Sequence, residues 1–178
     1  IGGLAGGLAA GLLTHNAGIG MAGAAAGAAL GGGLGYMVAN HNQAQAQTED
    51  QYQKAIAQAQ DTARQSQSDA QAANEVAEAG RQQLATLNAQ YKARQISAKD
   101  YNSQINTLRQ QANDMKKVAA SYRTQAASMN VYAQGRNNDK QMTAAAASTE
   151  QSQRQIEQSE NTLLSSLGAM PEAPSVSS

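Results

Sequence analysis

Apolar and small residues recur at alternating steps of four and three along two long stretches of this sequence. This heptad spacing places each series on one face of an α-helix and is typical of helices that pack along one another. An Ala-rich helix without a specific partner is the alternative, and it does not require so regular an alternation. The sequence therefore predicts an all-α fold. The first series is Tyr52, Ile56, Ala59, Ala63, Ser66, Ala70, Ala73, Ala77, Gly80, Leu84, Leu87 and Tyr91, and the second is Tyr101, Ile105, Leu108, Ala112, Met115, Ala119, Tyr122, Ala126, Met129 and Ala133.

The side chains available for a core are small. The 178 residues include no Phe, Trp or Cys, and Ala supplies most of the 41% hydrophobic fraction. Ala buries little apolar area, so burial stabilises each residue only weakly. Because Ala and Gln are good helix formers, helical propensity and close helix packing must supply much of the stability. We therefore expect an extended helical protein.

The residues between the two series predict a turn. Ser97 with Asp100 three residues later resembles a capping box, and Ile96 with Tyr101 fits a hydrophobic staple. We therefore expect residues 43–133 to form a long antiparallel coiled-coil hairpin with its apex near residue 96. One continuous helix through this region is the alternative.

A hairpin folded at this apex pairs the two series residue by residue. Tyr91 then faces Tyr101, Gly80 faces Ala112, and Tyr122 faces Ala70. Large side chains oppose small ones in such pairs, as close antiparallel packing requires.

The segment 134–167 is expected to supply a third helix, which runs from about Asp139 to Leu167 after a break at 134–139 with the sequence QGRNND. It would pack back along the hairpin. Residues 168–178 contain both prolines and small polar residues, and they read as an irregular tail. The apolar series of the third helix is Met142, Ala145, Thr149, Ser152, Ile156, Leu163 and Leu167.

The first 48 residues carry no Asp, Glu, Lys or Arg, although the chain as a whole has 13 acidic and 13 basic residues. Two apolar runs, 1–13 and 17–39, predict a helical hairpin over residues 1–42. The second run is long enough to cross a bilayer, and glycine at every fourth position lets helix backbones approach closely there. A flexible linker is the alternative reading. The expected helix-packing glycines are Gly3, Gly7 and Gly11 in the first run and Gly23, Gly27, Gly31 and Gly35 in the second.

Two resemblances follow from these residues. The glycine spacing within charge-free apolar runs resembles the glycine-zipper domains, of two-transmembrane type, of bacterial envelope proteins, many of which are outer-membrane lipoproteins. Some phage ejection proteins are broadly similar. The sequence YKARQISAKDY, residues 91–101, resembles the apex Y-x-x-G-x-I-S-x-x-E-Y of bacterial helical hairpins. Tyr91, Ile96, Ser97 and Tyr101 match this apex, whereas Arg94 replaces its Gly and Asp100 replaces its Glu.

No residue pattern argues for catalysis. His15 and His41 lie at opposite ends of the expected N-terminal hairpin, and no Gly-Lys-Ser/Thr follows the glycines to make a phosphate loop. We therefore expect a protein that is not an enzyme and uses no metal or cofactor. A net charge of zero without a basic patch argues against nucleic-acid binding.

The composition and the resemblances together indicate a structural or assembly subunit of a bacterial cell-envelope complex, such as a secretion or motility complex. Its expected partners are the lipid bilayer, further copies of the chain as a homo-oligomer, and other subunits. The glycine zipper would anchor it, with the outer membrane favoured, and the coiled coil would lie in the periplasm. Two alternatives stay open: a pore-forming or phage ejection protein, the latter carried in the virion, and a soluble adaptor packed inside a larger complex.

Overall fold

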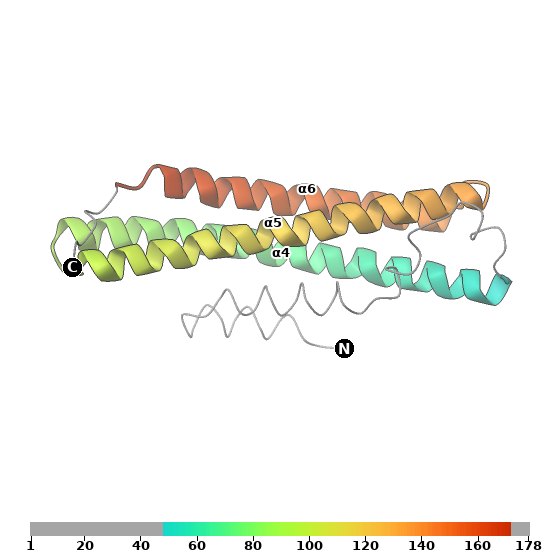
Figure 1. Ribbon diagram of the computed structural model, residues 1–178, viewed down its shortest axis with the longest axis horizontal. Coiled ribbons are helices and arrows are strands. Elements are labelled where there is room, and N and C mark those ends of the chain that lie inside the picture. The colour runs from blue at the N-terminus through green and yellow to red at the C-terminus, as the bar shows by residue number, and fades with distance from the viewer. Residues whose placement is uncertain (1–47, 172–178) are drawn as a thin grey trace.

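The computed structural model describes residues 48–171, which form three long α-helices: α4 (Glu49–Lys92), α5 (Ala98–Gly135) and α6 (Lys140–Gly168). The helices lie side by side in an elongated bundle, with α4 and α6 running in the same direction and α5 in the opposite one (Figure 1). At 1.5 Å per residue, α4 is about 66 Å long. The all-α prediction is confirmed for this part of the chain. The expected membrane hairpin, 1–42, lies outside the described residues, as do residues 172–178 of the tail.

Each helix begins at a side-chain cap. The Thr48 side chain accepts a hydrogen bond from the backbone N–H of Gln51, whose own side chain accepts one from the Thr48 N–H, so that α4 starts with a capping box. Ser97 accepts from the N–H of Asp100 at 3.0 Å to start α5. Asp139 accepts from two N–H groups of α6. These caps satisfy backbone donors that have no partner inside the helix.

The turn between α4 and α5 lies where the sequence indicated, because α4 ends at Lys92 and α5 begins at Ala98. The N–H of Gln95 donates to the carbonyl of Gln90 at 2.8 Å, and the N–H of Arg94 donates to that of Tyr91. This pair of bonds is a Schellman motif, whose penultimate position takes left-handed backbone and is usually Gly. Arg94 occupies that position with φ of 55°.

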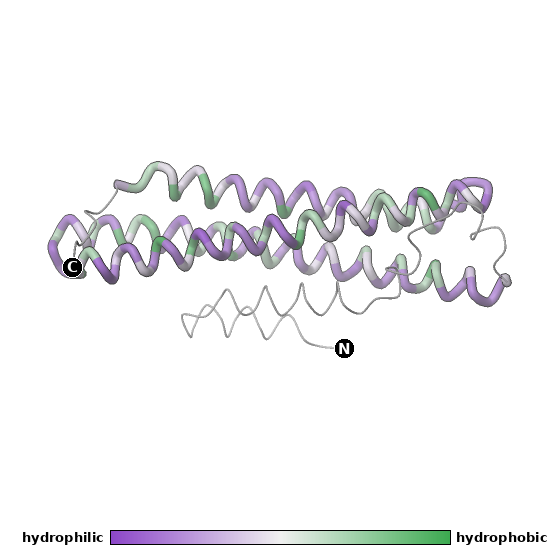
Figure 2. The backbone as a smooth tube through the Cα atoms, in the orientation of Figure 1, coloured by the Kyte–Doolittle hydropathy of each residue, from purple (hydrophilic) through white to green (hydrophobic). Residues whose placement is uncertain are grey.

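The apolar series identified in the sequence form the core. Every member is buried except Tyr91, which is half-buried. The structure also buries residues that flank the series, among them Ala55, Val76, Val118 and Ala146. Each helix has two neighbours, so it buries a wider strip than a two-stranded seam would. Hydrophilic residues cover much of the remaining surface along all three helices (Figure 2).

The third helix changes how the hairpin packs. Close backbone contact is extensive between α6 and α4 and between α6 and α5, and it is sparse between α4 and α5. A methyl group at Gly80 would lie 2.7 Å from Leu163 Cδ1 of α6 and 3.4 Å from Leu108 Cδ2 of α5. Gly80 therefore packs against Leu163 of α6 as well as Leu108 of α5, and α6 fills most of the space that a direct α4–α5 seam would have closed.

None of the three described helices is long and apolar enough to cross a membrane. The packing glycines expected at Gly3, Gly7, Gly11, Gly23, Gly27, Gly31 and Gly35 all precede the described residues.

Candidate functional site

The apex of the bundle brings together the residues that the sequence assigned to it. The rings of Tyr91 and Tyr101 stack, with centroids 4.6 Å apart, and Ile96 packs against the same core. The Ser97 hydroxyl also donates to Asp100 Oδ2 at 2.7 Å. The hydroxyl of Tyr101 donates to the carbonyl of Pro171 at 3.1 Å, which ties the end of the described chain to the apex. These contacts close the bundle, and they present no group arranged for chemistry.

A buried polar contact crosses the middle of the bundle. The Tyr122 hydroxyl of α5 donates to Asp69 Oδ2 of α4 at 2.7 Å, and the Gln65 amide donates to the other carboxylate oxygen at 3.0 Å. Burial raises the pKa of Asp69, an effect that these two hydrogen bonds oppose. Burial and the neighbouring carboxylate also raise the pKa of Tyr122. Asp69 thus holds the register of α4 against α5 and was missed by the sequence analysis, because it lies beside the apolar series and not in it.

The opposite end of the bundle carries an aromatic cluster. Tyr52 of α4 stacks on Tyr132 of α5 with centroids 5.6 Å apart, and the Arg136 guanidinium lies 4.6 Å from the Tyr52 centroid. Burial and the nearby Asp139 carboxylate raise the pKa of Tyr52 to about 12. This cluster joins the start of α4 to the turn between α5 and α6.

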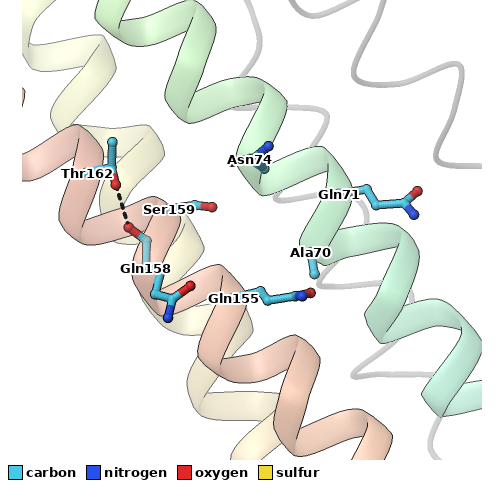
Figure 3. Close-up of a pocket in the computed structure, with 7 residues that line it drawn as sticks. All are labelled: Ala70, Gln71, Asn74, Gln155, Gln158, Ser159 and Thr162. Carbon is cyan, nitrogen blue, oxygen red and sulfur yellow. Dashed lines mark hydrogen bonds between the residues drawn. The ribbon is translucent and has the colours of Figure 1, made fainter.

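A groove on the described surface runs between the parallel helices α4 and α6, and it has a volume of about 440 Å³. Ala70, Gln71 and Asn74 line it from α4, and Gln155, Gln158, Ser159 and Thr162 line it from α6. Figure 3 shows Gln155 and Ser159 pointing from α6 toward α4, where Ala70 offers only a methyl group. The groove therefore has a small-residue floor and walls of uncharged amides and hydroxyls.

The same helix pair is bridged by amides elsewhere. The Gln60 amide donates to Gln141 Oε1 at 3.1 Å, and the Gln67 amide donates to Ser148 Oγ at 3.0 Å. Both pairs are 81 residues apart in sequence. Asn74 and Gln155, one heptad further on, share that offset (155 − 74 = 81), and they line the groove. The sequence signal for these bridges is a set of polar residues at heptad spacing beside the apolar series.

Across residues 48–171, no group of three or more His, Asp or Glu side chains is placed to hold a metal ion. The fold defines residues 48–171 as an elongated three-helix bundle with an uncharged groove between α4 and α6. No protein-family model, no curated protein and no solved structure matches the chain.

Proposed function

We propose that this protein is a non-enzymatic assembly subunit of a bacterial envelope complex. In this proposal the glycine-zipper segment, 1–42, anchors the chain in the bilayer and contacts neighbouring copies. The three-helix bundle then projects into the periplasm and forms lateral contacts with further subunits.

The observation that carries the proposal is where the bundle starts. The first charged residue, Glu49, is also the first residue of α4, so the structured bundle begins where the charge-free segment ends. Glu49 and the α5–α6 turn lie at one end of the bundle, and the apex lies at the other (Figure 1). A chain anchored through residues 1–42 would therefore carry its apex about 66 Å from the anchored end. This geometry suits a spacer or scaffold.

Membrane fractionation tests the anchor. The full-length chain, expressed in bacteria, should stay with the membrane pellet in high salt and enter solution only with detergent. Release by salt alone would contradict the anchor and support the soluble adaptor. Dye leakage from liposomes that contain the purified protein would instead support a pore-forming protein.

Glycine substitution tests the assembly. Gly27→Leu and Gly31→Leu place a large side chain on the line of small residues and should convert the detergent-solubilised assembly to smaller species. Ala29→Leu adds the same side chain on the opposite face of a helix and is the matched control. Circular dichroism of a fragment spanning residues 43–167, which lacks the anchor, should show that the fragment is helical by itself. If both glycine variants assemble like the wild type, the glycine-zipper part of the proposal is wrong.

A further inference from the structure

We propose that the groove between α4 and α6 is the surface on which a second copy of this chain docks, through the uncharged face of its own α6. This inference rests on the proposed assembly function and names the face that would carry it. The uncharged face is defined here by Ala144, Gln151, Gln155, Gln158, Thr162 and Ser165, all of which are exposed.

The charges of α6 are segregated away from this face. After Lys140 the helix has four charged residues. Glu157 pairs with Arg123 of α5, and Glu150 accepts a hydrogen bond from Asn130 of α5 and pairs with Arg154. Glu160 lies close enough to Lys116 of α5 for that cation to oppose the rise that burial causes in its pKa. The three carboxylates therefore lie toward α5, and the exposed Arg154 pairs with one of them. The side of α6 toward α4 is left without charge.

The facing edge of α4 is uncharged along the groove. Gln67, Gln71 and Asn74 lie on it, and the exposed ion pairs Asp61–Arg64 and Glu78–Arg81 bound it on either side. The two helices together thus present a band of amides and hydroxyls that is centred on the groove.

The side-chain amide bridges between α4 and α6 stop at the groove. Gln60 and Gln67 reach across to α6, but Asn74 has a side chain shorter by one methylene. Among residues 48–171, neither Asn74 nor Gln155 has a hydrogen-bonding partner for its side-chain amide. Each amide keeps a donor and an acceptor that a docked side chain could satisfy.

A second copy fits this surface better than a charged partner. An amide both donates and accepts, so an amide-lined face is complementary to itself, as a twofold interface between identical chains requires. A charged ligand would have to bury its charge unpaired here. Because the net charge of the chain is zero, copies have no long-range repulsion to overcome.

The available area supplies more than half of what a stable dimer needs. The uncharged band runs along about 33 Å of α6 and about 20 Å of α4, at a width of about 10 Å on each helix, which gives roughly 500 Å² per copy. Typical specific interfaces bury about 800 Å² per partner. Contacts of the anchor segment would add to this area under the proposed function.

Cysteine crosslinking of the full chain in detergent tests the docking. The sequence has no Cys, so single variants are unambiguous. Gln151→Cys, Gln155→Cys and Gln158→Cys lie on the uncharged face, and Asn161→Cys, which is also exposed but shares the heptad position of Arg154 outside that face, is the control. With a short thiol-to-thiol crosslinker, at least one variant on the face should give about tenfold more homodimer than the control, which corresponds to about 1.4 kcal/mol of preference. Equal crosslinking, or capture of a different protein only, would overturn the proposal.

A charge-pair experiment gives an independent readout. Gln155→Glu and Gln155→Lys should each lower the mass of the detergent-solubilised assembly, because like charges then meet across the interface, and a one-to-one mixture should restore it. If every variant keeps the wild-type mass, the groove inference fails while assembly through the anchor stands. If the wild-type chain is monomeric and salt releases it from membranes, the proposed function fails as well.

Discussion

Replacing Gly80 by alanine tests the position of α6 in the bundle. Gly80 is buried inside α4, and an added methyl group would lie 2.7 Å from Leu163 Cδ1. Real Cβ atoms do not approach other atoms so closely, so one of the two groups must move. Leu163 has no exposed surface and can move only by disturbing its own packing.

Two effects of this substitution oppose each other. Alanine inside a helix is favoured over glycine by about 1 kcal/mol. Overpacking a closed core costs about 1–3 kcal/mol. We therefore expect Gly80→Ala to lower the free energy of unfolding by about 1 kcal/mol. In a Leu163→Val background, where the Cδ atoms are absent, the same substitution should raise it by about 1 kcal/mol. The coupling of about 2 kcal/mol is of the size found for residues in contact.

Urea unfolding of a fragment spanning residues 48–171, followed by circular dichroism at the helix band, measures all four combinations. Gly168→Ala is the matched control, because a methyl group there would meet nothing within 4 Å. Its effect should be the same in both backgrounds. If Gly80→Ala stabilises the fragment by about 1 kcal/mol with Leu163 intact, then Gly80 does not face α6. The direct pairing of α4 with α5 would then be correct.

Two further predictions concern single side chains of the bundle. Because burial raises the pKa of Asp69 above its ordinary value of 3.8, the folded state holds this proton more tightly, and the stability that results is lost as pH rises through the folded-state pKa. Asp69→Asn keeps an acceptor for Tyr122 and removes this pH dependence. As the pH falls from 7 to 4, the melting temperature of the wild type should therefore rise relative to that of the variant. Arg94→Gly should raise the free energy of unfolding in urea by about 1 kcal/mol, because Arg94 has φ of 55° and glycine adopts this backbone without strain.

Each of these predictions has its own contradicting result. A constant difference in melting temperature across that pH range would show that Asp69 titrates alike in the folded and unfolded chain. For the turn, Ala89→Gly in the regular part of α4 is the control and should cost about 1 kcal/mol. If Arg94→Gly lowers the free energy of unfolding as much as Ala89→Gly does, the left-handed backbone at Arg94 contributes no strain.

The sequence by itself determined which residues are helical and which face of each helix is buried. Heptad spacing fixes the buried face locally, because the α-helical period repeats whatever the partner is. All seven apolar positions expected in the third helix, from Met142 to Leu167, are buried. The turn near Ile96 was likewise determined by nearby residues, because Ser97 caps the helix that follows it.

Only the tertiary structure decided which faces meet. Heptads of small residues can pack in several arrangements. A residue-by-residue pairing of α4 with α5 also takes no account of a third helix, α6, that packs against both. The structure puts Leu163 of α6 against Gly80, and it buries Asp69 with Tyr122 beside the apolar series. The uncharged groove between α4 and α6 also depends on this choice, because it exists only where two parallel helices lie side by side at a fixed offset along their axes.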